Sequence, residues 1–153
     1  MNTAVEAEKY VKKWCEENGR KFVRKHGKEC QGCDLIVQGK NKRIFIEVKG
    51  STKEKFNDVR PYITMNELEK AIKERKNYEF HILLGVRDGA AKKHYIVSGG
   101  DLIEFKEFLV EAKEFQERWS KSKMSEILWP QVSVYLKKNI GKEAETYINL
   151  RHL

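Results

Sequence analysis

The sequence of 153 residues contains only 2 prolines, which interrupt helices and strands, and 3 cysteines, which can form disulfides. So few cysteines, in an odd number, argue against a disulfide-stapled secreted domain and favour a reducing compartment. No apolar run approaches the ~18 residues of a transmembrane helix, and the N-terminus lacks the apolar segment of a secretory signal. We therefore expect a cytoplasmic protein, most of it one domain with its own core.

The cysteines and histidines could suggest a metal site. Cys30 and Cys33 form a C-x-x-C pair with His26 nearby, which leaves a zinc site or a redox dithiol as alternatives. A structural zinc needs four ligands, and only Cys15, on a predicted helix, could complete the set. We expect free thiols instead. We also expect packing or surface roles for the histidines, which lack metal-ligand spacing: His26, His81 and His94.

The charge is strongly positive. Lys and Arg number 31 against 23 acids, which gives a formal net charge of +8. A basic surface of this size suits a polyanion, and nucleic acid is the commonest one. The alternative is a charge-rich surface of the kind found in thermophiles.

The hydrophobic pattern predicts an α/β fold, a central mixed sheet flanked by helices. Thr64 and Glu67 have the spacing of a capping box at a helix start. A substrate contact by Asn66 is an alternative role for this segment. Besides a central hairpin, the expected elements are a helix over 3–17 ended by Gly19, a strand over 21–24, a helix from 64 to about 76, strands over 79–86 and 94–97, and a helix from 102 to about 121.

The C-terminal segment 120–153 is too apolar for a disordered tail. Val132, Val134 and Leu136 alternate as in a strand. We expect a core over 1–119 and an extension over 120–153, helical or extended, that covers the sheet or forms a homodimer interface.

Residues 33–50 carry the most informative pattern. Two apolar runs flank a Gly/Lys/Asn turn, which predicts a β-hairpin. Side chains alternate along a strand, so Glu47 and Lys49 share one face with Phe45, while the even-numbered apolar residues of this strand point to the core. Charged residues in so apolar a strand are costly to bury, which indicates a functional role.

The expected register brings two carboxylates together. If the turn is centred on Lys40 and Asn41, Asp34 lies opposite Glu47, with Cβ atoms ~5 Å apart. Carboxylates that close repel each other unless a proton or a cation lies between them, and hard oxygen ligands suit Mg²⁺ or Mn²⁺. A divalent ion beside Lys49 is suited to attack on a phosphodiester.

Asp34, twelve intervening residues and then Glu47-Val48-Lys49 resemble the motif of the PD-(D/E)XK, or restriction-endonuclease-like, nuclease superfamily, with Cys33 in place of its proline. The stretch from Ala7 to Val97 more closely resembles the NO VEIN-type domain. The shared elements are Ala7-Glu8, Gly32-Cys33-Asp34, the strand Ile46 to Gly50, the helix start Thr64 to Glu67 and the strand Tyr78 to Val86.

The resemblance implies a restriction-endonuclease-like core and a magnesium site formed by Asp34, Glu47 and the main-chain carbonyl of Val48. Lys49 would then orient the attacking water or stabilise the transition state. Glu8, on the edge of the first helix's buried stripe, would assist from that helix. The alternatives are an ordinary solvated Glu8 and a weaker candidate, Glu6.

Six basic residues are expected to hold phosphates and position the strand without reading sequence. The alternative is a solvated basic face. These residues are Arg24, Lys25, Lys28, Lys40, Lys42 and Arg43.

The sequence thus predicts a metal-dependent nuclease with DNA as the expected substrate, in a restriction, defence or DNA-processing role. A homodimer would suit cleavage of both strands of a duplex. The main alternative is a non-catalytic nucleic-acid-binding or assembly module on the same fold, and a third is a different enzyme or a structural protein. The sequence contains no P-loop motif, so any translocation would belong to another chain.

Overall fold

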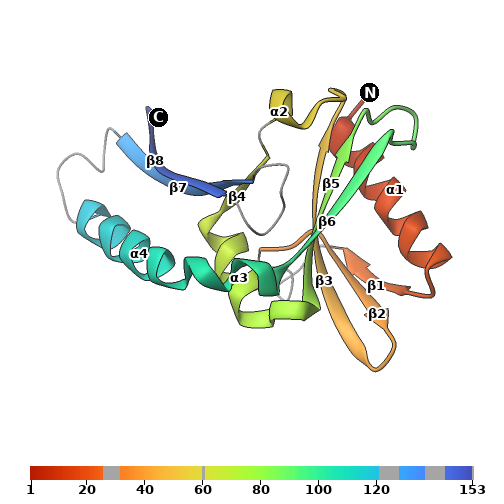
Figure 1. The fold of residues 1–153 in the computed structure, drawn as a ribbon, viewed down its shortest axis with the longest axis horizontal. Helices are drawn as coiled ribbons and strands as arrows, with labels where there is room; N and C mark the ends of the chain where they lie inside the picture. The colour runs from red at the N-terminus through yellow and green to blue at the C-terminus, as the bar shows by residue number, and fades with distance from the viewer. Residues whose placement is uncertain (26–31, 60, 121–127, 137–143, 153) are drawn as a thin grey trace.

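The computed structural model describes residues 1–25, 32–59, 61–120, 128–136 and 144–152. The predicted α/β class is confirmed: a five-stranded mixed sheet has the order β1-β2-β3-β5-β6, with helices on both faces (Figure 1). Only the β3–β5 pairing in this sheet is parallel. The elements are α1 (Thr3–Glu17), β1 (Lys21–Lys25), β2 (Leu35–Gly39), β3 (Lys42–Ser51), α2 (Phe56–Val59), β4 (Tyr62–Thr64), α3 (Met65–Glu74), η2 (Arg75–Asn77), β5 (Tyr78–Leu84), β6 (Lys93–Ser98), η3 (Gly99–Phe105), α4 (Lys106–Ser120), β7 (Leu128–Leu136) and β8 (Ala144–His152).

Helix α1 has the predicted bounds and covers one face of the sheet (Figure 1). Asn2 caps its first turn, and Gly19 follows its last turn with φ +74°, as expected of a helix-ending glycine. Ala7, Val11 and Cys15 form its buried stripe. The packing on β3 is close, since a Cβ on Gly50 would lie 2.5 Å from the Cβ of Ala7.

The β2–β3 hairpin has the predicted register. Leu35 pairs with Ile46 and Gly39 pairs with Lys42, and Asn41 in the turn has φ +62°. The predicted faces are confirmed as well. Ile44, Ile46 and Val48 pack in the cluster under α1, while Phe45 packs in the cluster under α3.

The second face is covered by α3 and η3, and α4 packs against these two elements (Figure 1). Thr64 caps α3 as predicted, but α3 ends at Glu74, earlier than expected. The predicted helix start at Leu102 was wrong, because residues 99–105 form a 3₁₀ helix and α4 begins at Lys106. A Cβ on Gly99 would lie 2.5 Å from the carbonyl oxygen of Ala71. The main chain at Gly99 is therefore packed tightly against α3, and the α-helix begins only after this contact.

The C-terminal segment forms a second sheet, in the order β4-β7-β8. The predicted strand around Val132 lies in β7, which pairs antiparallel with both β4 and β8. The second strand, β8, was not predicted. Among the described residues, no helix has the length and apolarity that a membrane crossing requires.

Candidate active site

Asp34 lies at the mouth of the hairpin, immediately before β2. Its N–H donates to the carbonyl of Ile46 at 2.8 Å. Its carboxylate oxygen Oδ2 accepts from the N–H of Val48, also at 2.8 Å. The main chain and the side chain of Asp34 thus both bind β3, and this fixes the carboxylate beside Glu47.

The carboxyl groups of Glu47 and Asp34 lie close enough for each to shift the pKa of the other. Burial raises the pKa of Glu47, and the negative charges of Glu67 and Asp34 add to this effect. Burial also raises the pKa of Asp34, with a further contribution from the charge of Glu8. Two carboxylates this close retain a proton between them, or require a cation in its place.

The ammonium of Lys49 lies between the carboxylates of Glu47 and Glu67. Its Nζ is 2.6 and 2.8 Å from the two oxygens of Glu67 and 3.6 Å from Oε1 of Glu47. Burial lowers the pKa of Lys49, but the charges of Glu67 and Glu47 outweigh burial and the pKa is raised. The ring of Tyr62 lies 5.3 Å from Nζ, so Lys49 is charged and held in one place.

Glu67 was missed as a site residue. The predicted cap is half right, since Oγ1 of Thr64 accepts from the N–H of Glu67 at 3.4 Å. The carboxylate of Glu67, however, binds Lys49, and the residue is only 6% exposed. The signal in the sequence was that Glu67 belongs to the pattern shared with the NO VEIN-type domain. Its burial is further evidence of a role, because a glutamate that only caps a helix has no reason to be buried.

Glu8 reaches the site from α1. Its charge contributes to the raised pKa of Asp34, and its oxygen Oε2 is buried. The alternative, Glu6, instead pairs with Lys9 at 3.4 Å and lies near Gly89 in the β5–β6 loop. The structure therefore favours Glu8 over Glu6 as the acid from the first helix.

The loop before Asp34 is held from two sides. The hydroxyl of Tyr78 donates to the carbonyl of Gly32. Gly32 has φ +78°, and a Cβ there would lie 2.7 Å from the carbonyl oxygen of Asn66. The main chain of Asn66 thus packs against this loop, while its side chain is exposed.

The residues at the hairpin mouth can hold a divalent cation. Among the described residues, no group of three or more His, Cys, Asp or Glu side chains forms a preformed metal site. Mg²⁺ often takes only one or two carboxylates and fills its remaining positions with water and phosphate. Asp34 and Glu47 supply two. The N–H and C=O of a strand residue point to the same edge, so the carbonyl of Val48 faces the Asp34 side.

The predicted phosphate-binding residues do not gather at this point. Lys40 and Lys42 are exposed at the hairpin turn, and the five steps along the strand from Lys42 to Glu47 span ~16 Å. Arg43 is exposed near the same turn, and Arg24 lies partly buried on β1. The side chain of Lys25, and Lys28 as a whole, lie outside the described residues.

The cysteines and histidines form no zinc site in the described part of the chain. Cys15 and Cys33 are buried in clusters on opposite faces of the sheet, so Cys15 cannot complete a site with Cys33. His26 and Cys30 lie outside the described residues. His81 and His94 pack as expected, with Nδ1 of His81 at 2.8 Å from Nε2 of His94.

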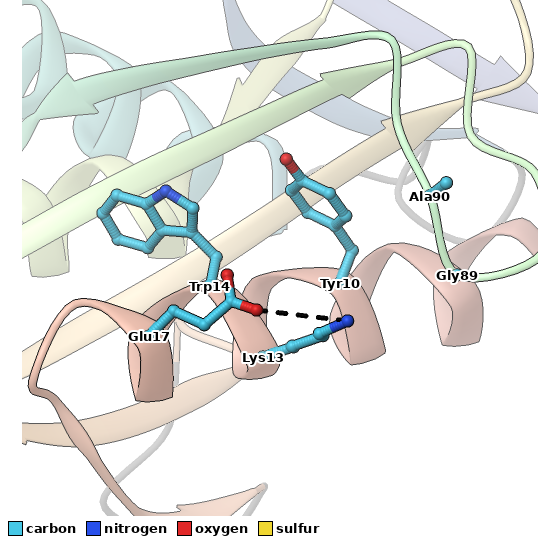
Figure 2. Close-up of a pocket in the computed structure, with 6 residues that line it drawn as sticks. All are labelled: Tyr10, Lys13, Trp14, Glu17, Gly89 and Ala90. Carbon is cyan, nitrogen blue, oxygen red and sulfur yellow. Dashed lines mark ion pairs between the residues drawn. The ribbon is translucent and has the colours of Figure 1, made fainter.

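A separate pocket lies beside α1, on the face opposite the carboxylates. Figure 2 shows Tyr10 and Trp14 pointing from α1 toward the sheet, with Gly89 and Ala90 of the β5–β6 loop at the far end. The only charged side chains that line it are Lys13 and Glu17, a solvent-exposed pair 4.0 Å apart. This pocket lacks the paired carboxylates of the hairpin mouth, which remains the candidate active site.

The sequence of this chain matches the model of a known protein family. The family model described as Protein NO VEIN, C-terminal matches residues 6–97. No curated protein and no solved structure matches the sequence. The match spans 92 of 153 residues (97 − 6 + 1) and includes Glu8, Asp34, Glu47, Lys49 and Glu67. The chain therefore belongs to the family of the NO VEIN C-terminal domain.

Proposed function

We propose that this chain is a metal-dependent nuclease of the PD-(D/E)XK type that hydrolyses phosphodiester bonds, with DNA as its substrate. The observation that carries the proposal is the convergence of Asp34, Glu47 and Lys49 at the hairpin mouth. The main-chain hydrogen bond to Asp34 and the pairing of Lys49 with Glu67 hold them there. The resemblance to the superfamily motif supports the same assignment.

The charges of the site support the use of a divalent cation. Asp34, Glu47 and Glu67 interact with the ammonium of Lys49, and the charge of Glu8 acts on Asp34. So much negative charge in a partly buried place would repel a phosphodiester unless a cation were present. Asp34, Glu47 and the carbonyl of Val48 would hold Mg²⁺ or Mn²⁺. When bound, such an ion lowers the pKa of water and offsets charge on the scissile phosphate.

The side chains then have distinct roles. Lys49 can donate a hydrogen bond to a phosphate oxygen or to the attacking water, because an ammonium has three N–H groups. Glu67 keeps Lys49 charged and oriented. Glu8 can accept a hydrogen bond from water on the α1 side of Asp34.

A cleavage assay with matched variants tests the proposal. Supercoiled plasmid, linear duplex, single-stranded DNA and RNA are each incubated with wild type in Mg²⁺, in Mn²⁺ and in EDTA. Asp34→Asn and Lys49→Met remove site charges, while Lys42→Met removes a lysine from the exposed end of the same strand. We expect metal-dependent cleavage by wild type and Lys42→Met, and a loss of about 100-fold or more in the two site variants.

Two results would contradict the proposal. Cleavage that survives in both site variants would show a contaminating or different activity. If wild type binds DNA but cuts none of the substrates with either metal, the non-catalytic binding module becomes the better explanation.

A further inference from the structure

Two loops meet at the end of the sheet where the parallel strands β3 and β5 finish. The N–H of Gly85 donates to the carbonyl of Lys53 at 2.8 Å, and the N–H of Val86 donates to the carbonyl of Ser51 at 3.0 Å. Ligands of α/β sheets commonly bind beyond the carboxyl ends of parallel strands. These hydrogen bonds join the two loops into a single surface.

The β5–β6 loop has a tight turn. Arg87 and Ala90 exchange both main-chain hydrogen bonds, at 3.0 and 2.9 Å. Asp88 and Gly89 between them have φ +49° and +75°, the conformation of a type I′ hairpin turn. Arg87 therefore projects from an ordered turn.

The two loops are rich in positive charge. Residues 52–55 and 85–93 contain five cations and two acids, which gives a net charge of +3. Arg87, Lys92 and Lys93 are all exposed. Lys92 pairs with Glu54, whose pKa is lowered first by that hydrogen bond and then by the charges of Lys92, Arg87 and Lys93. The three cations thus lie on one short hairpin loop, where, among the described residues, only Lys92 of the three pairs with a carboxylate.

Within this basic surface, Lys93 is aligned with Lys49. Across the sheet, Lys49 pairs with Ile82, and Ile82 pairs with Tyr95. Lys93 lies two residues before Tyr95 on β6, so it shares the face of Lys49. Strand spacings of ~4.8 Å and rises of ~3.3 Å per residue place the two Cα atoms ~12 Å apart. Phosphates repeat every ~3.4 Å along one strand of a duplex, so the separation corresponds to a few nucleotides.

We propose that Arg87, Lys92 and Lys93 form a phosphate-binding surface for the backbone of the nucleic acid that enters the active site. The inference rests on the proposed function and assigns the substrate path to the β5–β6 end of the sheet. The hairpin turn with Lys40, Lys42 and Arg43 lies at the opposite end (Figure 1). Exposed cations of this kind bind the phosphate backbone without selecting a sequence.

The test compares two triple variants with the same change in net charge. Arg87→Gln/Lys92→Gln/Lys93→Gln removes three charges from the proposed surface, and Lys40→Gln/Lys42→Gln/Arg43→Gln removes three from the hairpin turn. Binding to a fluorescein-labelled duplex and to a labelled single strand is measured by anisotropy in EDTA over a salt series. Because EDTA prevents metal-dependent cleavage, the result does not depend on activity.

The release of counterions from DNA determines how large a loss of affinity we expect. Three phosphate contacts contribute ~2.7 to the slope of log K against log salt on duplex DNA. We expect the loop variant to lose ~10- to 100-fold in affinity at 0.15 M salt, with a slope lower by ~2–3. The hairpin variant should stay within about threefold of wild type. Equal losses in both variants, a larger loss in the hairpin variant, or no DNA binding by wild type would each overturn the proposal.

Two additional measurements separate the possible failures. Lys93→Glu reverses one charge on an exposed strand position and should weaken binding more than Lys42→Glu, which tests the surface if the triple variant folds poorly. Plasmid cleavage is followed in parallel. Cleavage with equal losses of binding in both triple variants would overturn only the surface, whereas surface-dependent binding without cleavage would overturn only the nuclease.

Discussion

The ammonium of Lys49 lies 2.6 and 2.8 Å from the two carboxylate oxygens of Glu67, so it is held symmetrically by one residue 18 positions away in the sequence. The side chains are only 21% and 7% exposed. The pair connects β3 to the first turn of α3 and leaves Glu47 at 3.6 Å on another side of the ammonium. Glu67 therefore positions Lys49.

The first prediction concerns this pair. Hydrogen bonds to charged groups contribute ~1.5–3 kcal/mol, so Lys49→Met and Glu67→Gln should each lower the free energy of unfolding by ~2 kcal/mol. The two residues contact each other, so the double variant should lose ~1–2 kcal/mol less than the sum of the single losses. Urea unfolding measures all four proteins, and strictly additive losses would contradict the pairing.

The second prediction concerns metal binding. A ligand that binds only the native state stabilises it by RT ln(1 + [L]/Kd), so Mg²⁺ or Mn²⁺ should raise the melting temperature of wild type. EDTA should reverse the change. Asp34→Asn and Glu47→Gln should lose the response, because each removes one of the two carboxylates proposed to bind the metal.

The metal-free state provides a control for that experiment. Because Glu47→Gln removes repulsion between buried carboxylates, its melting temperature in EDTA should equal or exceed that of wild type. A variant that unfolds much earlier than wild type in EDTA would show a structural role for Glu47 that is separate from the metal.

The hairpin was predictable because its determinants are local. The alternation of side chains along a strand determined which residues of β3 share a face, and the turn at Lys40 and Asn41 fixed the register of the β2–β3 pairing. Glu67 was not predictable by the same rule. A capping box explains a glutamate at the third position of a helix, and only the docking of α3 on the sheet brings its carboxylate to Lys49. The capping-box pattern gave Glu67 a sufficient local explanation, and its contact with Lys49 was therefore not predicted.

The basic residues illustrate the same limit. Lys40, Lys42 and Arg43 are close to Glu47 in the sequence, but an extended strand places Arg43 ~13 Å and Lys42 ~16 Å away. Arg87 and Lys93 are about 40 residues further along the chain than Glu47, yet the parallel β3–β5 pairing brings them to the nearer end of the sheet. The proposed path of the substrate thus depends on how the strands are paired, which the local sequence does not reveal.

The third prediction concerns pH. Burial lowers the pKa of His81, and burial with the charge of His81 lowers the pKa of His94 to about 4. The unfolded chain, with histidine pKa values near 6.5, therefore binds more protons than the native state between about pH 4 and 6.5. Their contribution to stability is complete above pH 6.5 and is lost as the pH falls toward 4.

His94→Phe isolates this contribution. The raised pKa values of Asp34 and Glu47 act in the opposite direction, so the informative quantity is the difference between wild type and variant. We expect His94→Phe to be less stable than wild type at pH 7.5 because it loses the hydrogen bond to His81, and the difference should shrink by pH 5. A constant difference, measured by urea unfolding, would contradict the assignment.

The fourth prediction concerns the contact between α1 and β3, which sets the position of Glu8. A Cβ at Gly50 would meet the Cβ of Ala7 at 2.5 Å, whereas a Cβ at Gly100 would lie 3.6 Å from its nearest neighbour, an ordinary contact. Overpacking costs ~1–3 kcal/mol, so Gly50→Ala should lose that much stability while Gly100→Ala stays near wild type. Any relief of the clash moves α1 off the sheet and carries Glu8 away from Asp34. Gly50→Ala should therefore also lower metal-dependent cleavage at temperatures where the variant is fully folded. Normal cleavage by a destabilised Gly50→Ala would show that Glu8 does not assist the reaction.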